Sequence, residues 1–128
     1  MKRDMDLVRD ILFAIEASET DPRAWIDLKL EGRSQQEVVY HVQLLGEAGL
    51  LIAQDLQTIG ASGYKHMPKR LTWQGHEFLD TIRDPEVWRQ TKISAQKVGG
   101  FSLDVISALA KGFIKEQVRK ATGIEIDL

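Results

Sequence analysis

The spacing of apolar residues changes several times along the chain, and each spacing predicts a different element. Near the N-terminus apolar residues recur every three or four positions, which predicts a helix over about residues 4–17. These positions are Met5, Val8, Leu12 and Ile15. Residues 25–30 alternate between polar and apolar types, which predicts a short strand with Ile26, Leu28 and Leu30 on one face.

A second helix with clear start and stop signals follows this strand. Ser34 and Glu37 have the spacing of a capping box, in which the two residues satisfy free N–H groups of the first turn. Gly49 is placed to end the helix in the left-handed conformation. The buried stripe is expected to contain Val38, Val39, Val42 and Leu45.

A hairpin follows the second helix. Residues 50–56 are predicted to form a strand, residues 58–68 a loop, and residues 69–72 the returning strand. This helix and hairpin outline the recognition helix and the wing of a winged helix-turn-helix, a fold most often used to contact nucleic acid.

Helical spacing returns after the hairpin and continues towards the C-terminus. Helices are predicted over about residues 72–84, 86–97 and 102–121. Each of the three tryptophans falls beside an apolar pattern, so we expect all three to anchor the core. A base-stacking role would instead require them to be exposed beside cationic side chains. These tryptophans are Trp25, Trp73 and Trp88.

Together these elements predict an α+β fold, a winged helix-turn-helix with a C-terminal helical extension. We expect residues 1–84 to form the winged-helix domain and residues 85–128 to form helices that pack on it or mediate dimerisation. Gly112 lies within the last helix and would let another helix approach closely, so both arrangements remain open.

The composition excludes several classes of protein. The 128 residues include no cysteine, so neither disulfides nor thiolate metal sites can form. The net charge is −2, and residues 1–83 carry 10 Lys or Arg against 13 Asp or Glu, which is not the balance of a nonspecific nucleic-acid binder. No stretch has the apolar length of a membrane span or a signal peptide, so we expect a cytoplasmic protein that does not enter a membrane.

The outer face of the second helix is the surface that a recognition helix would present to a major groove. It carries Glu37, Tyr40, Leu44 and Glu47, with Gln36, His41 and Gln43 at its edges. The helix contains no Lys or Arg, although affinity for DNA follows the number of phosphates neutralised. Gln36 and Gln43 have the amide groups that pair with adenine, so a nucleic-acid hypothesis uses Gln36, Tyr40 and Gln43 near bases.

Cationic side chains gather at the predicted wing. Lys65, His66, Lys69 and Arg70 are close together in the sequence. One interpretation is a wing that grips the DNA backbone through Lys65, Lys69 and Arg70, with Tyr64 alongside. The other interpretation, which the sequence favours, is a solvated hairpin whose lysines keep an exposed sheet edge soluble.

Tyr40 and Leu44 are unusual residues for an outer helix face. Tyr is enriched at protein interfaces, so the pair suits a contact with another protein. The alternative interpretation, which the sequence supports equally, is that one of the chain's own C-terminal helices covers Tyr40 and Leu44. The protein-interaction hypothesis uses Tyr40, Leu44 and Phe113, the last from the apolar face of the final helix.

Candidate chemistry is sparse. His76 and Asp80 have the spacing of a metal pair on a helix, but a zinc protease needs a second His at the position of Asp80, and no third ligand is evident. The sequence GASG at residues 60–63 lacks the Lys and the helix that follow a phosphate-binding loop. We therefore expect no catalytic residues, no metal and no cofactor, and a protein that is not an enzyme.

Four stretches carry a family resemblance, namely MKRDMDLVRDIL at the start, WIDL at residues 25–28, YHVQLLGEAGLL at 40–51 and LTWQGHEFLD at 71–80. They resemble a small bacterial and phage family known as domain of unknown function two-five-one-three. The resemblance covers nearly the whole chain and implies a winged-helix-like fold and a prophage or mobile-element origin. It implies no activity, so no site residue follows from it. The stretch at 40–51 also resembles the recognition helix of bacterial winged-helix regulators, although Val39, Tyr40, Gln43 and Leu44 stand where those regulators often carry Ser, Arg or Lys.

Two functional hypotheses follow from these patterns. The first is a DNA-binding transcriptional regulator, dimeric through the last helix, that contacts double-stranded DNA. The second is a protein-protein interaction module that binds a host or phage protein without DNA. The first predicts one positive surface formed by wing and helix, and the second an exposed apolar patch around Tyr40 and Leu44.

Overall fold

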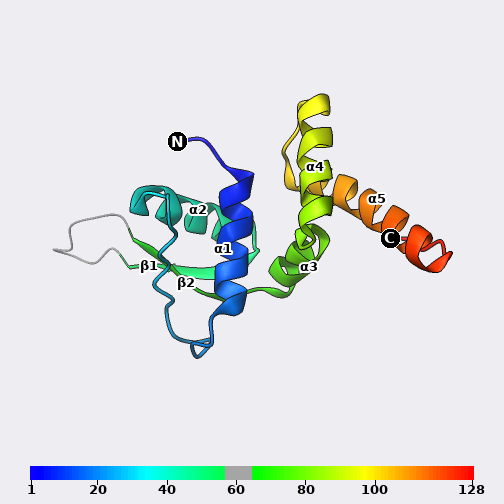
Figure 1. Ribbon diagram of the computed structural model, residues 1–128. Helices are drawn as coiled ribbons and strands as arrows, with labels where there is room; N and C mark the ends of the chain where they lie inside the picture. The colour runs from blue at the N-terminus through cyan, green and yellow to red at the C-terminus, as the bar shows by residue number, and fades with distance from the viewer. Residues whose placement is uncertain (57–64) are drawn as a thin grey trace. The chain divides into compact units, whose positions relative to one another are not determined.

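The computed structural model describes residues 1–56 and 65–128 (Figure 1). Its α+β architecture contains, in the described residues, five helices and a two-stranded antiparallel sheet. Their order is α1 (Met5–Ala17), α2 (Gln35–Glu47), β1 (Leu51–Asp55), β2 (His66–Leu71), α3 (Trp73–Ile82), α4 (Pro85–Val98) and α5 (Leu103–Thr122). The chain divides into two compact units, Met1–Glu77 and Phe78–Leu128.

Helix α1 begins where the sequence predicts. The side chain of the N-cap residue Asp4 accepts hydrogen bonds from the N–H groups of Asp6, at 2.9 Å, and Leu7, at 3.2 Å. One side of the helix is buried and forms much of the core of the first unit. Its buried residues are Met5, Leu7, Val8, Ile11, Leu12 and Ile15.

Helix α2 has both of its predicted caps. Ser34 and Glu37 form the capping box, in which the Glu37 N–H donates to the Ser34 hydroxyl and the Ser34 N–H donates to the Glu37 carboxylate. At the other end Gly49 has a φ of 76°, which suits glycine, and the Leu50 N–H donates to the Leu45 carbonyl at 3.0 Å. This is the Schellman arrangement that satisfies the last carbonyls of a helix.

Strands β1 and β2 form a ribbon with a bulge. The register pairs Ile52 with Arg70 and Ala53 with Pro68, so Lys69 is an extra residue in β2. Pro68 and Leu71 are both buried although they are three positions apart, which a regular strand with alternating faces does not allow. The bulge therefore turns two consecutive residues, Lys69 and Arg70, away from the core. Helices α1 and α2 contact each other and this ribbon (Figure 1).

The predicted strand at residues 25–30 is wrong. The segment keeps the alternation of buried and exposed positions, and the Ile26 N–H donates to the Pro68 carbonyl at 2.8 Å, but no strand forms there. Proline has no N–H to return a hydrogen bond from β2, so the pairing does not continue into a ladder. Residues 18–34 also contain no helix, so the first helix of a helix-turn-helix is missing.

A close backbone contact joins β1 to the start of α3. The Thr72 N–H donates to the Leu50 carbonyl at 3.0 Å, and the Thr72 hydroxyl donates to the Gly49 carbonyl at 2.5 Å. Gly75, in the first turn of α3, passes so close that a Cβ there would lie 1.8 Å from the Leu50 carbonyl oxygen. Only glycine allows this approach.

Helices α4 and α5 belong to the second unit, together with the end of α3 from Phe78, and they pack against each other (Figure 1). Asp84 caps α4, with Pro85 at its first position, and Gly99 ends it with a φ of 72°. Ser102 caps α5, and its hydroxyl accepts from the Val105 N–H at 3.2 Å. The predicted limits of both helices are confirmed to within one or two residues.

The prediction that all three tryptophans lie in the core is confirmed for only one of them. Trp88 is 4% exposed and belongs to the core, but Trp25 is 48% and Trp73 is 76% exposed. Among the described helices, none is both long and apolar enough to span a membrane.

Candidate nucleic-acid interface

The outer face of α2 is acidic, and several of its polar groups already have partners. The Glu37 carboxylate is used in the capping box and lies 3.7 Å from the Arg33 guanidinium. The Gln43 amide donates to the Glu47 carboxylate at 3.4 Å. Gln36 is exposed at the first turn. The face that was predicted to read bases therefore offers two amides and two carboxylates.

Tyr40 and Leu44 are half-buried in α2, and Phe113 is half-buried in α5. None of the three belongs to the exposed large apolar side chains of the described residues, which include Trp25, Ile52 and Trp73 in the first unit. Tyr40 and Leu44 therefore present only part of their side chains at the surface.

His41 was expected at the edge of the outer face, but it is buried, with 1% exposure. Its Nδ1 lies 2.8 Å from the Glu37 carbonyl oxygen, and its Nε2 lies 2.8 Å from the Asp4 nitrogen. Since the Asp4 N–H can only donate, Nε2 accepts and Nδ1 carries the proton, which is one neutral tautomer. His41 therefore ties α2 to the N-terminus of α1, and a contact 37 residues away in sequence accounts for its burial.

Asp4 is the centre of this polar link. Its carboxylate accepts from the Arg33 guanidinium at 2.7 Å while it also caps α1. Partial burial acts to raise the pKa of the Asp4 carboxyl, but the hydrogen bonds from Arg33 and from the Leu7 and Asp6 N–H groups outweigh it and lower the pKa below its usual value. Arg33 is thus engaged with Asp4 and Glu37 rather than directed to a ligand.

The cations of the ribbon lie at its surface. Lys65 and Arg70 are exposed and Lys69 is partly exposed. The Arg70 guanidinium donates to the Leu71 carbonyl at 3.1 Å, and this hydrogen bond restrains the Arg70 side chain. The rest of the predicted wing, including Tyr64 and GASG at residues 60–63, lies outside the described residues.

Trp25 lies beside these cations. Its indole N–H donates to the Gln54 side-chain oxygen at 3.2 Å, and the Lys69 ammonium lies 5.9 Å from the centre of its ring. This is the arrangement that was required for base stacking, at a residue that was expected in the core. The alternation of residues 25–30 carried the signal, because it puts Trp25 on the same face as Asp27 and Lys29.

A shallow hollow of about 140 Å³ opens next to this cluster. Lys69 and Arg70 line it from β2, while Glu16 and His76 line it from α1 and α3. The His76 ring nitrogen lies 3.9 Å from the Glu16 carboxylate, so His76 has a partner other than Asp80, which pairs with Arg83. No group of three His, Asp or Glu side chains that could hold a metal ion occurs in the described part of the chain.

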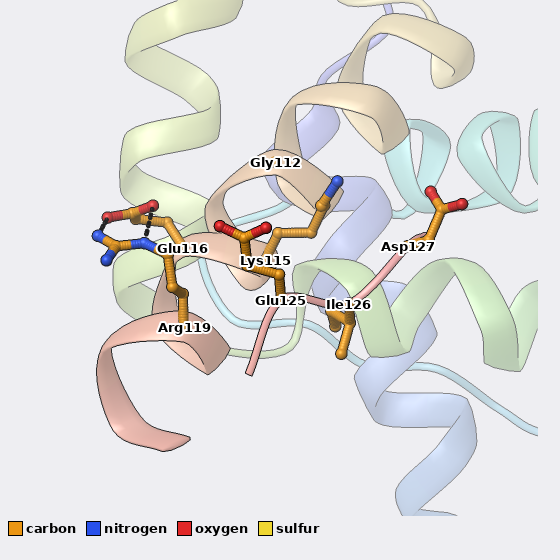
Figure 2. Close-up of a pocket in the computed structure, with 7 residues that line it drawn as sticks. All are labelled: Gly112, Lys115, Glu116, Arg119, Glu125, Ile126 and Asp127. Atoms are coloured by element: carbon orange, nitrogen blue, oxygen red, sulfur yellow. Dashed lines mark hydrogen bonds and ion pairs between the residues drawn. The ribbon is translucent and has the colours of Figure 1, made fainter. Parts of the chain in front are cut away.

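A larger hollow, of about 650 Å³, lies in the second unit between the last turns of α5 and the C-terminal tail (Figure 2). Glu116 and Arg119 pair with each other, and Lys115 lines the hollow with the carboxylates of Glu125 and Asp127. Cations and carboxylates compensate each other here. This hollow therefore presents less net positive charge to an anionic ligand than the ribbon does.

Comparison with known proteins supports the family assignment made from the sequence. The model of the family described as Hypothetical protein (DUF2513) matches residues 2–102. A curated protein of Haemophilus influenzae (strain ATCC 51907 / DSM 11121 / KW20 / Rd), described as "Uncharacterized protein", is 34% identical over 119 residues, which is 92% of this chain and 99% of the relative. No solved structure matches the chain. The match over residues 2–102 shows that the chain belongs to the Hypothetical protein (DUF2513) family.

Proposed function

We propose that this protein is a small winged-helix-like DNA-binding regulator that grips duplex DNA with its ribbon rather than with the outer face of α2. The observation that carries the proposal is the bulge in β2, which brings the consecutive cations Lys69 and Arg70 to the surface. Affinity for duplex DNA comes mainly from neutralised phosphates, and this surface supplies the charge that α2 lacks.

The winged-helix part of the proposal rests on the order of elements. A helix with a Schellman end is followed directly by an antiparallel ribbon, as in the recognition helix and wing of that fold. The missing first helix of the helix-turn-helix and the acidic face of α2 favour a module in which the ribbon contacts the DNA. Such a regulator needs no catalytic group and would act in the cytoplasm, where it meets DNA.

We also propose that the protein forms a homodimer through α5. A Cβ at Gly112 would have nothing within 4 Å, so this side of α5 has room for the close approach of another helix. Dimerisation would double the number of phosphate contacts, because a two-fold dimer presents two ribbons to one duplex.

A protein-interaction module is the second candidate. The acidic outer face of α2, with Glu47 exposed beside the half-buried Tyr40 and Leu44, repels DNA and would attract a basic protein segment. This candidate and DNA binding use different surfaces of the first unit, so variants can separate them.

The experiment is a fluorescence-anisotropy titration of a labelled duplex pool of random sequence at low and moderate salt. Wild type is compared with a Lys65→Ala, Lys69→Ala, Arg70→Ala triple variant. The matched control removes three exposed lysines of the second unit, Lys97, Lys111 and Lys120, and so has the same net charge. An α2 variant, Gln36→Ala with Gln43→Ala, tests the other surface.

The expected result is salt-sensitive binding by wild type. In the ribbon variant the plot of log affinity against log salt should become shallower by roughly 0.9 for each phosphate that is no longer neutralised, and the control should behave as wild type. Absence of binding at low salt, or an equal loss in the control, would overturn the proposal. Binding of a labelled Arg-rich peptide that is abolished in Glu47→Lys would then support the protein-interaction candidate.

A further inference from the structure

We propose that Trp25 and the hollow beside it form a site for one unpaired nucleotide, with the base stacked on Trp25 and the phosphate held by Lys69 and Arg70. The inference rests on the proposed nucleic-acid function and adds a ligand class to it. The preferred ligand is a single strand, or a duplex with an unpaired end, rather than a fully paired duplex.

Trp25 has the properties of a stacking platform. Nearly half of its surface is exposed, although tryptophan is a residue that folding usually buries. The hydrogen bond from its indole nitrogen to Gln54 fixes the orientation of the ring before any ligand arrives. A ring held in this way loses little conformational freedom when a base stacks on it.

Lys69 connects the platform to the hollow. Its ammonium lies 5.9 Å from the centre of the Trp25 ring, and Lys69 is also one of the residues that line the hollow. A nucleotide has an aromatic base and an anionic phosphate joined by a sugar, so it needs an aromatic surface and a cation close together. Sites for single-stranded nucleic acid combine these two features.

The hollow is large enough for a phosphate group, and part of its lining suits one. Lys69 and Arg70 provide positive charge, and the hydroxyl-bearing side chains Ser18 and Thr20 lie at its wall. Glu16 is a carboxylate that also lines the hollow and opposes an anion, and the His76 ring nitrogen lies 3.9 Å from it. The hollow therefore combines two cations with one carboxylate, a balance that still favours an anion.

The geometry favours an unpaired base for a simple reason. In a paired duplex both faces of an internal base are covered by its neighbours, so a tryptophan cannot stack on it unless the base leaves the helix. A single strand or an overhang offers a free base face at no such cost. The paired duplex can still bind through phosphates, and hence more weakly.

The test compares three labelled ligands, an oligothymidine single strand, a blunt duplex and the same duplex with a single-stranded overhang. The variant Trp25→Leu removes the aromatic face, and Trp25→Phe restores one. Trp73→Leu is the matched control, because Trp73 is also an exposed tryptophan but lies at the start of α3. Circular dichroism and thermal unfolding verify that each variant is folded.

We expect Trp25→Leu to weaken binding of the single strand and of the overhang about tenfold, the value of one stacked base, and to leave the blunt duplex unchanged. Trp25→Phe should recover much of the loss, and Trp73→Leu should bind as wild type. In addition, oligothymidine should quench the fluorescence of wild type more than that of Trp25→Phe, because stacking quenches the Trp25 indole.

The possible failures are distinguishable. If the ligands bind, binding needs Lys69 and Arg70, and Trp25→Leu has no effect, the unpaired-nucleotide site is overturned and the nucleic-acid function stands. If no ligand binds at low salt, the proposed function fails and this inference fails with it. If Trp73→Leu weakens binding as much as Trp25→Leu, the assignment to Trp25 is overturned.

Discussion

The two compact units of this chain differ in the range of their polar interactions. In the first unit polar groups far apart in sequence are joined, as in the hydrogen bond from Asp4 to His41 and the contact of Thr72 with Gly49. In the second unit the exposed ion pairs join residues three positions apart on a helix, as in Glu86 with Arg89 and Glu116 with Arg119.

This difference in range predicts where substitutions should change the stability of the protein most. An exposed pair on one helix competes with water and contributes little to stability, whereas a buried polar group that loses its partner keeps its full desolvation cost. The first unit also positions Trp25 and Lys69, so its long-range contacts hold the proposed binding surface together. We therefore expect large effects in the first unit and small effects in the second.

The largest effect is expected when Gly75 of the first unit is replaced by alanine. Gly75→Ala would put a methyl group 1.8 Å from the Leu50 carbonyl oxygen and force the backbone of β1 and α3 apart. We expect a loss of about 3 kcal/mol in the free energy of unfolding. Chemical denaturation of the full chain measures it.

Gly112→Ala in α5 is the control for this prediction, since nothing lies within 4 Å of a Cβ there. Alanine is the better helix former, so this variant should gain about 1 kcal/mol in the free energy of unfolding when the chain is dilute enough to be monomeric. Similar losses in both variants would contradict the difference between the units. A loss at Gly112 alone would indicate that a second copy packs against α5 in solution.

The next effect is expected at the buried histidine. His41→Leu removes the acceptor of the Asp4 N–H and the donor to the Glu37 carbonyl while the apolar surroundings stay filled. We expect a loss of about 1–3 kcal/mol. Hydrogen exchange followed by mass spectrometry should show faster exchange at the start of α1.

Gln43→Ala is the control on the same helix, because it removes only the exposed hydrogen bond to Glu47. Its stability should stay near that of wild type. If His41→Leu were equally neutral, the link between α1 and α2 would not contribute to stability.

A smaller effect is expected from the charge of Asp4. Its pKa is lowered in the folded chain, so its ionised form contributes stability above the pKa of the unfolded chain, and this contribution is lost as the pH falls through the folded value. Asp4→Asn keeps a capping oxygen but removes the ion pair with Arg33. Thermal unfolding between about pH 5 and pH 3 should therefore show a shallower decline for Asp4→Asn than for wild type. Parallel declines would mean that the Arg33 pair gives no stability.

The smallest effect is expected in the second unit. The hydrogen bonds from Arg89 and Gln90 lower the pKa of Glu86 to about 2, although both partners of the ion pair are exposed. In Arg89→Ala the pKa of Glu86, followed by NMR, should rise towards its ordinary value, while the unfolding midpoint hardly moves. A clear drop in the midpoint would show that local pairs do stabilise this unit.

Much of the helical structure could be predicted because its signals are local. Ser34, Glu37 and Gly49 define the ends of α2 by hydrogen bonds that span only a few residues, so their spacing in sequence is sufficient. The strand at residues 25–30 could not be judged in this way. Whether it pairs depends on its neighbour, and the neighbour offers Pro68, which has no N–H.

The candidate site shows the same division. The cations Lys65, Lys69 and Arg70 could be named from the sequence, and so could the acidic character of the outer face of α2. Trp25 was expected in the core, since a large aromatic residue beside an apolar pattern is usually buried, although the alternation of its segment pointed the other way.

The sequence by itself determined the helices, their caps, the charge of each surface element and the family, because these depend on residues that are close along the chain. The tertiary structure alone decided that His41 is buried, that the bulge brings Lys69 and Arg70 to the surface together, and that Trp25 lies beside Lys69. Each of these depends on a contact between segments that are distant in sequence, and periodicity within one segment does not show which other segment will cover it.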